Sequence, residues 1–448
     1  MAGLAGPSSL KGGLALAAGA SEDEHSRNLP EASPTATPGR AFPAISSADS
    51  LALSLMLFQA LTACAIAVTP VVANELTDKF QLSGSQIGLL SSLFLMMYCV
   101  GAIPMGMAAA RWGGRVMAVG VILLTAGSIF FALSASYSWF LIARLVQGLG
   151  ASAAVPVANA LVCQTVPRER QGRALGIFGT GTGLGYLFAL AVMPSLQNAG
   201  GYPTVFLVLA VLSVLVGLVA FSRREARALP RRAGEESSFR GVARALRQAA
   251  VNPRLWAVAL INTGASATAV TILAWTPSFL EKQFGASLAV AAYLTAGVAA
   301  AQLVGNPLGA LAMGRWGRVP VIVVSLVGMT ILTALLPLSQ ILVLCFLIVV
   351  IAGFFTMAMF PAVIGIIPDV VDRPEQVGTA TGFVFLFNLI GMMIPPWLFG
   401  KLLDVYGTTP GDNGFLRGYL MLAAFPFAGI LATLAFRMMS RRAPTPLR

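Results

Sequence analysis

The chain has 448 residues, of which 57% are hydrophobic and 10% are charged, and its net charge is +12. Soluble domains carry about 25% charged residues, so this composition excludes an ordinary soluble protein and indicates a membrane protein. The positive charge could suggest nucleic-acid binding, but the arginines lie in short segments between apolar runs. Because they do not form one face of a soluble domain, we expect no nucleic-acid partner.

The beginning of the chain differs in composition from the rest. Residues 1–49 are rich in Ala, Gly, Pro and Ser and include an acidic patch at 22–24. Such a segment buries too little apolar surface to fold, so we expect a disordered cytoplasmic tail. The apolar stretch 12–20 after Lys11 leaves a signal peptide as an alternative, although it is short and rich in glycine.

Twelve apolar runs follow, and they approach the roughly 20 residues with which a helix crosses about 30 Å of hydrocarbon. They lack the two-residue alternation of barrel strands, so the predicted fold class is an all-α membrane protein with twelve transmembrane helices. The expected spans are 51–75, 87–109, 116–134, 139–161, 174–196, 204–221, 255–280, 290–313, 320–337, 341–367, 379–402 and 418–438.

A polar segment divides these spans into two groups of six. It covers residues 222–254, between the sixth and the seventh span. The predicted domains are therefore an N-terminal six-helix half at 50–221, a cytoplasmic central loop at 222–254, a C-terminal half at 255–438 and a cytoplasmic tail at 439–448.

A short basic turn occurs in both groups. The sequence GMAAARWGGR at 106–115 returns as GALAMGRWGR at 309–318, with Arg111 and Arg315 separated by 204 positions. Two residues of span four recur 205 positions later in span ten, where Gly353 and Pro361 match Gly148 and Pro156. A duplicated six-span unit explains these matches, so we expect two pseudo-symmetric halves.

Lysines and arginines fall almost entirely in segments that would share one side of the membrane. Positive residues beside membrane spans stay in the cytoplasm, so we expect both termini to be cytoplasmic. The expected location is a bacterial-type cytoplasmic (inner) membrane. The lipid bilayer is then a partner, and the sequence is compatible with a monomer.

Several of these motifs resemble those of the major facilitator superfamily, along almost all of residues 51–438. They are the basic turn, the sequence RLVQGLG at 144–150, which is similar to the family's RxxQGxG signature, and the Gly-rich helix at 176–185. The resemblance implies two six-helix halves that carry a small-molecule substrate by alternating access. The chain departs from the family's turn, because Ala110 and Gly314 stand where an aspartate is usual.

The basic turns are candidates for an inner gate. Gly113, Gly114 and Gly317 are expected to allow positive φ in these tight turns. The arginines either serve topology alone or pair across the two halves, with Arg111 or Arg115 contacting Asp369, Asp372 or Glu375. The candidate gating residues are Arg111, Arg115, Glu169, Arg173, Arg315, Arg318, Asp369 and Glu375.

Arg144 is the one charged residue that the sequence places well inside a span. A charge at bilayer depth is costly and usually marks function, so a role in the cavity is one interpretation. Arg144 is also only five residues after Trp139, at the expected outer boundary, so its side chain could instead reach outward to the interface. Both interpretations stay open here.

In the resembling family, spans one, four, seven and ten line the cavity, and polar or aromatic residues in or beside them are candidate substrate contacts. These candidates are Gln59, Arg144, Gln147, Asn159, Asn262, Trp275, Gln302, Asn306 and Asn388. Carboxylates fall in tails, loops and span ends, so none is expected near the midplane to hold a proton or a cation. We therefore expect a neutral or anionic small organic solute, moved by facilitation, exchange or symport that uses Glu75 or Arg144.

Other functions remain as alternatives. A proton-coupled multidrug exporter fits if the cargo is hydrophobic and neutral, and a membrane scaffold or receptor fits if transport was lost. We expect no enzyme, cofactor or metal site, because the single histidine, His25, is in the tail and no phosphate-binding loop occurs. The four cysteines lie in or beside apolar spans without CxxC spacing and are expected to act as small apolar residues.

Overall fold

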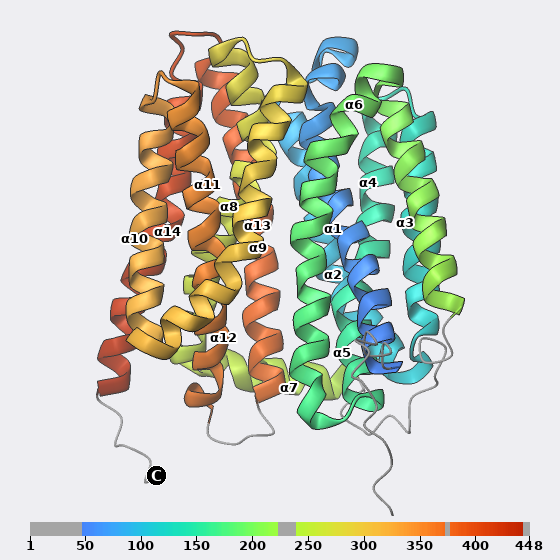
Figure 1. Cartoon of the computed structure of the whole chain (residues 1–448), viewed down its shortest axis with the longest axis vertical. Coiled ribbons are helices and arrows are strands. Elements are labelled where there is room, and N and C mark those ends of the chain that lie inside the picture. Colours follow the sequence, from blue (N-terminus) through green and yellow to red (C-terminus); the bar gives the residue numbers. More distant parts are fainter. Residues whose placement is uncertain (1–46, 223–238, 372–376, 442–448) are drawn as a thin grey trace, which may run out of the picture. The chain divides into compact units, whose positions relative to one another are not determined.

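The computed structural model describes residues 47–222, 239–371 and 377–441, and every regular element in these ranges is helical (Figure 1). These helices belong to one compact unit, Ile45–Arg448. The tail predicted at 1–49 lies almost wholly outside the described residues, as does half of the predicted central loop.

Six helices form the first group. They are α1 Ser47–Phe80, α2 Gly84–Trp112, α3 Arg115–Leu133, α4 Tyr137–Ala151, α5 Ala154–Thr165 and α6 Arg168–Ser222. The long helix α6 contains non-helical backbone at Gly200 and at Gly201, where φ is +70°. It therefore holds two of the predicted spans, joined at this kink.

The second group begins with α7, which packs against α8 and α13 at the bottom of the view in Figure 1. The elements are α7 Phe239–Val251, α8 Pro253–Phe284, α9 Leu288–Trp316, α10 Arg318–Leu335, η3 Leu336–Leu338, α11 Leu342–Ala358, α12 Phe360–Ile366, η4 Ile367–Val370, α13 Val377–Tyr406 and α14 Gly414–Arg441. Spans four and ten are each broken in two, as α4 with α5 and α11 with α12.

Eleven stretches of the described helices are long and apolar enough to cross a membrane. One of them, Ala174–Ser222, includes the kink of α6 and is long enough for two crossings. The twelve predicted spans are thus accounted for. Their packing brings together helices that are not consecutive in the sequence, since α1 and α3 pack on α6 in the first group, and α8 packs on α13 and α14 in the second.

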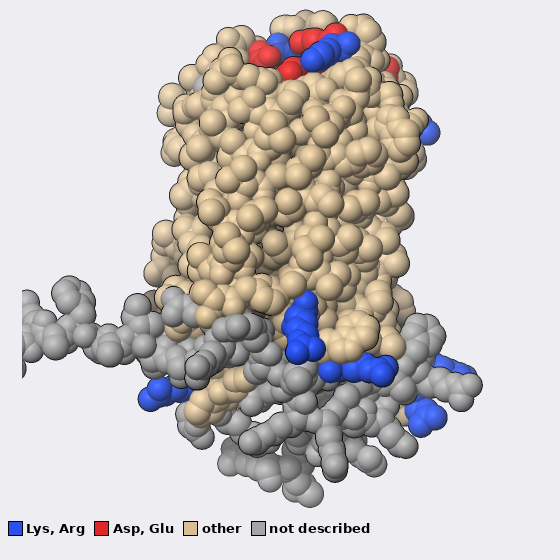
Figure 2. Space-filling view, turned by 90° about the vertical axis from the view of Figure 1, so that its right-hand side faces the viewer, with Lys and Arg blue, Asp and Glu red and all other residues tan. Residues whose placement is uncertain are grey.

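Charged side chains gather at the two ends of these helices and leave an uncharged band between them on the face that Figure 2 shows. One end, here the carboxylate end, carries Asp78, Glu281 and Asp404. The other, here the arginine end, carries the basic turns. In these turns Gly113 has a φ of +57° and Gly317 a φ of +87°, as predicted, but the prediction for Gly114 is wrong because its backbone is helical, with a φ of −65°.

Two helices extend further toward the carboxylate end than their apolar runs predict. Helix α8 continues to Phe284 and α13 to Tyr406, and each ends at a glycine with positive φ, Gly285 or Gly407. A left-handed glycine ends a helix whatever the polarity of its last turn. Glu281 and Asp404, expected in loops, are therefore held on rigid helices.

Candidate functional site

The two groups of helices meet closely near the carboxylate end, where α2 lies against α13. A Cβ atom on Gly84 would lie 2.8 Å from the carbonyl oxygen of Gly400, and one on Gly88 would collide with the backbone of Pro396. Glycine permits this approach because it has no side chain to separate the two backbones.

Asp404 of α13 bridges this contact by binding the first backbone N–H groups of α2, next to Ser83, which is the N-cap residue of the helix. Its Oδ1 accepts a hydrogen bond from the Gly84 N–H at 2.5 Å, and its Oδ2 accepts one from the Ser85 N–H at 2.8 Å. The first N–H groups of a helix have no partner within the helix and carry positive partial charge, so a carboxylate stabilises them. Asp404 thereby joins the C-terminal group to the N-terminal group.

A second bridge joins α1 and α8 at the same end. The side-chain amide of Asn74 donates to Glu281, and its oxygen accepts a hydrogen bond from the Ser278 hydroxyl at 3.1 Å. One asparagine therefore holds two residues on adjacent turns of α8. Glu75, the neighbour of Asn74, instead accepts from Gln197 of its own group at 3.1 Å.

Among the described residues, contacts between the groups reach from the carboxylate end to about halfway toward the arginine end. Cys99 of α2 lies 3.8 Å from the carbonyl oxygen of Leu386, and a Cβ on Gly183 of α6 would lie 2.5 Å from Leu303 of α9. Further toward the arginine end, Cβ atoms on Gly179 and Gly382 would have no atom within 4 Å. In the described residues, the helices that close the carboxylate end thus have open space between them at these glycines, toward the arginine end.

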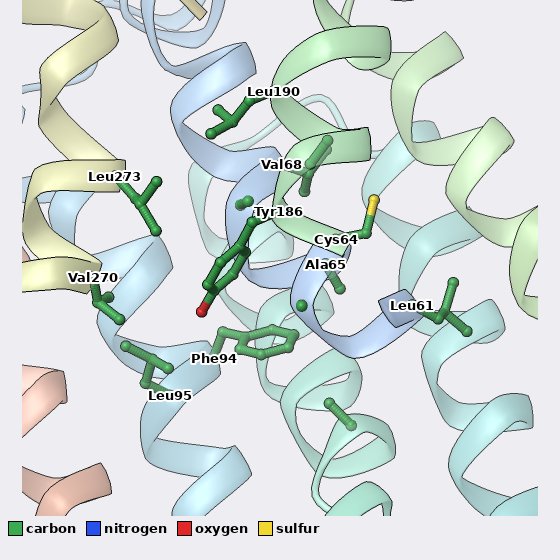
Figure 3. Close-up of a cluster of buried hydrophobic side chains, with 14 of the residues drawn as sticks. Leu61, Cys64, Ala65, Val68, Phe94, Leu95, Tyr186, Leu190, Val270 and Leu273 are labelled. Carbon is green, nitrogen blue, oxygen red and sulfur yellow. The ribbon is translucent and has the colours of Figure 1, made fainter. Parts of the chain in front are cut away.

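A small cavity lies where this separation begins. Its volume is about 10 Å³, which is about the space of one water molecule. Its lining comes from α1, α2, α6 and α8 and consists of Ile66, Ala67, Pro70, Ser91, Leu95, Tyr186, Val270, Leu273 and Ala274. Figure 3 shows the hydroxyl of Tyr186 directed toward the side chains of Val270 and Leu95.

Arg144 is fully buried beside this region and does not reach the interface, so the structure contradicts the outward-reaching interpretation. Its Nε donates to the carbonyl oxygen of Leu90 at 3.2 Å, and one terminal nitrogen donates to that of Ala65 at 2.9 Å and to Gln147 at 2.8 Å. The guanidinium lies 4.4 Å from the ring centroid of Phe94. Arg144 therefore ties α4 to α1 and α2.

Two other candidate contacts are also used in packing. The Gln147 amide donates to Ser128 on α3 at 2.9 Å, which extends the Arg144 network to a third helix. The Trp275 indole donates to the carbonyl oxygen of Pro396 at 3.0 Å and stacks on Phe399 at a centroid distance of 5.5 Å.

Four buried amides each keep one polar atom without a hydrogen-bond partner among the described residues, and so does the Arg144 guanidinium. The amides belong to Gln59, Asn262 and Asn388, which are candidate contacts, and to Gln197, and the Gln59 amide nitrogen donates to Thr182 at 2.9 Å. Buried polar atoms are nearly always paired, so such atoms call for a ligand or water. Gln302 is buried as well, whereas Asn159 and Asn306 are exposed.

The candidate gating residues do not form the expected contact between the groups. Arg318 forms an ion pair with Asp369 of its own group. The structure therefore contradicts the predicted pairing of Asp369 with Arg111 or Arg115. Arg111, Arg115 and Arg315 are exposed. The side chains of Glu169 and Arg173, and all of Asp372 and Glu375, lie outside the described residues.

Sequence reasoning missed four residues that matter here, namely Tyr186, Asn74, Glu281 and Asp404. Tyr186 follows the Gly-rich stretch of span five and is the one large polar side chain near it, which could have marked it. Nothing in the sequence pairs Asn74 with Glu281 or Asp404 with Gly84, since these residues are hundreds of positions apart.

Comparison with known proteins gives a consistent picture. The family model of the Major Facilitator Superfamily matches residues 53–293 and 268–448. The Membrane sensor protein UhpC of Salmonella typhimurium is 25% identical over 405 residues, which are 83% of this chain and 87% of that protein. The Probable anion transporter 4, chloroplastic, of Oryza sativa subsp. japonica is 30% identical over 144 residues, so the match spans 32% of this chain and only 24% of that protein.

Two solved structures have a similar fold. One is a bacterial homolog of the human lysosomal transporter Spinster in an inward-facing and occupied conformation, with a TM-score of 0.70 and 19% identity over 88% of this chain and 98% of that one. The other is the nucleoside transporter NupG, with a TM-score of 0.69 and 15% identity over 86% of this chain and 99% of that one. At these identities the likeness shows the fold, and it confirms the predicted arrangement of twelve helices in two halves.

Proposed function

The chain belongs to the Major Facilitator Superfamily, and we propose that it moves a small organic solute across a membrane by alternating access. The observation that carries this proposal is the asymmetry between the two ends of one helix interface. The N-terminal and C-terminal halves touch at the carboxylate end, through Asp404 on α2 and Asn74 on α8, and are separated at the arginine end. This is the geometry of a transporter that is closed on one side.

In the proposed cycle the halves rock about the region of the small cavity. Opening the carboxylate end breaks the hydrogen bonds of Asp404 and Asn74, and the arginine end closes in exchange. The surfaces of Gly179 on α6 and Gly382 on α13 suit this closure, because they have open space in front of them and glycine allows close helix contact.

We assign the arginine end to the cytoplasm and the membrane to the bacterial-type inner membrane. The support is the excess of arginine in the turns at this end, since positive residues mark cytoplasmic loops. In this orientation the structure is an inward-open state. Arg111 and Arg115 would then act in the other state, where the closing halves bring them near acidic residues of the C-terminal half.

The solute would bind between the halves, beside the small cavity. Gln59, Asn262 and Asn388 are the candidate amides with unpaired polar atoms. Gln147 and Trp275 are held by other parts of the protein, and so is Arg144 apart from one terminal nitrogen. Substrate contact is therefore proposed for the three amides first, with Gln302, Asn159 and Asn306 as further contacts.

A second candidate function is that of a sensor that kept this fold and lost transport. The relative named Membrane sensor protein UhpC favours it, because that match covers most of both chains. Counterflow of a pooled, labelled metabolite library into proteoliposomes separates the two. A transporter takes up at least one compound in exchange for its unlabelled form, whereas a sensor takes up none. Repeating the uptake with a proton ionophore tests coupling to a proton gradient.

A further inference from the structure

The inner surface of this protein holds no free positive charge among the residues that the structure describes. Between the charged ends of the described helices, Arg144 is the one ionised side chain, and its guanidinium is bound to two backbone carbonyls and to Gln147 and lies on the Phe94 ring. Its second terminal nitrogen has no hydrogen-bond partner among the described residues, but the residue is 0% exposed and presents no charge to the path. A cation engaged in this way is held away from a solute. A carboxylate or phosphate placed here would lose its hydration without gaining an ion pair, which is costly.

The closed end of the proposed solute path is apolar. Seven of the nine residues that line the small cavity are Ile, Leu, Val, Ala or Pro, and Ser91 and Tyr186 supply the two hydroxyl groups. The Tyr186 hydroxyl has no hydrogen-bond partner among the described residues, and in Figure 3 it points between aliphatic side chains. This end therefore suits an apolar group with at most one polar neighbour.

The unpaired amides lie on the arginine side of this apolar end. Gln59 precedes Pro70 on α1, and Asn262 precedes Leu273 on α8, in each case by about three helical turns, so each amide shares a helix face with a residue that lines the cavity. Both helices run from the arginine end to the carboxylate end. The two amides, one in each half, therefore face the separated part of the interface.

Asn388 joins them from α13. Thr263, the neighbour of Asn262, contacts α13 at Gly391, and Leu386 contacts α2 at Cys99. These contacts fix Asn388 at the same depth, between α8 and α2. Gln59, Asn262 and Asn388 are all at least nine-tenths buried, and each retains one unpaired amide atom. The proposed path therefore has an apolar end at the small cavity and uncharged hydrogen-bonding amides on the arginine side of it.

We propose that the solute is uncharged, and that it binds with an apolar part toward Tyr186 and with hydrogen-bonding groups on the amides of Gln59, Asn262 and Asn388. The proposal rests on the proposed function for the location of the path and adds the substrate class. It separates this chain from the relatives that are named anion transporters, because no described residue of the path offers an anion a free cation.

The test uses matched pairs of a primary amide and the carboxylate with the same carbon skeleton, namely phenylacetamide with phenylacetate and hexanamide with hexanoate. Binding is measured as the thermal shift of the full chain in detergent, and exchange is measured as counterflow in proteoliposomes. We expect the amides to stabilise the protein and to exchange, and the carboxylates to do neither. Stronger binding of the carboxylates, or no binding of either amide, overturns the proposal.

Variants locate the effect in the path. Asn262→Leu and Asn388→Leu remove a hydrogen-bonding group at nearly constant volume, and each should weaken amide binding about 5- to 10-fold, the value of roughly one hydrogen bond. Thr333→Val is the matched control, since Thr333 on α10 is also buried with an unpaired hydroxyl but lies outside the path. An equal loss in the control contradicts the assignment.

The outcome also separates this inference from the proposed function. If pooled anionic metabolites exchange while the amides do not bind, the chain is a transporter and the uncharged substrate class is wrong. If the amides bind but no compound exchanges, the binding site stands and transport is wrong.

Discussion

At the residue scale, the structure changes the interpretation of Arg144 more than that of any other candidate residue. A buried charge inside a membrane span usually marks a substrate or proton path. Here its donors meet the carbonyl oxygens of Ala65 and Leu90 and the amide of Gln147, so the residue fastens three helices of the N-terminal half. A planar guanidinium can serve several acceptors at once, and a lysine ammonium cannot match this geometry.

We therefore predict that Arg144→Gln and Arg144→Lys both destabilise the protein, by about 2–4 kcal/mol, since buried carbonyls lose charged donors. Thermal unfolding in detergent should show a loss of several degrees in each variant. Arg244→Gln, on the exposed face of α7, is the control and should leave the unfolding temperature unchanged. Normal stability together with abolished counterflow would instead make Arg144 a substrate contact.

Trp275 offers a milder test at the same scale. Its indole N–H donates to Pro396 at 3.0 Å, while its ring stacks on Phe399. Trp275→Phe keeps an aromatic ring and removes the donor, so we predict a loss of about 1 kcal/mol in the free energy of unfolding. Denaturation with urea in detergent measures it. A much larger loss would mean that ring packing, and not the hydrogen bond, dominates.

At the scale of elements, the ends and crossings of helices decide the state of the protein. The first N–H groups of helix α2 donate hydrogen bonds to Asp404 of α13, and Gly88 of α2 lets the two backbones approach. Further toward the arginine end, beyond the contact of Cys99 with Leu386, a Cβ on Gly382 of α13 would have no described atom within 4 Å. One helix pair therefore carries both the closed and the separated part of the interface.

Removing the Asp404 carboxylate should favour the state that is open at the carboxylate end. Replacing a capping residue with alanine costs about 0.5–2 kcal/mol, so Asp404→Ala should raise the population open at the carboxylate end about 2- to 30-fold. In a cysteine-free background, thiol labelling of Ser91→Cys with an impermeant reagent from the carboxylate side reports this opening. Asp412→Ala is the control, because Asp412 bonds only to Thr409 within its own loop. Unchanged labelling in the Asp404 variant would show that the cap does not hold the gate.

A side chain at Gly88 should act in the same direction. Gly88→Ala places a methyl group against the backbone of Pro396, so α2 and α13 must separate at the carboxylate end. Spin labels at Gln81→Cys and Pro410→Cys should then report a longer distance by electron paramagnetic resonance. Gly176→Ala, where no atom lies within 4 Å of the added Cβ, should leave the distance as it is. A lengthening in both variants would point to general loosening.

At the scale of the whole molecule, the two halves and their charged ends set orientation. Trp112 and Trp316 occupy matching places in the two basic turns and are 53% and 66% exposed. If the halves are repeats, both turns lie on one side of the membrane. Arginine in these turns assigns that side to the cytoplasm.

Cysteine labelling tests this assignment. Trp112→Cys and Trp316→Cys should both resist an impermeant thiol reagent in intact cells and react in inside-out vesicles. Pro410→Cys, in the loop after α13 at the carboxylate end, should show the opposite pattern. Reaction of the two turn cysteines from opposite sides would contradict both the orientation and the duplication.

The sequence by itself determined the helices, their number and their two-fold arrangement, because hydropathy and the recurrence of the basic turn can both be read from the order of residues. It also placed Gln59, Asn262 and Asn388 among the candidates, since polar side chains in apolar runs are visible in one dimension. It could not predict the partners of Arg144 or of Asp369, because these depend on packing between distant segments. Only the tertiary structure decided that Arg144 is engaged, that Asp404 and Asn74 close one end, and that the halves separate at the other. Whether a buried polar group is satisfied depends on the atoms that surround it in space, and the order of residues along the chain does not contain that information.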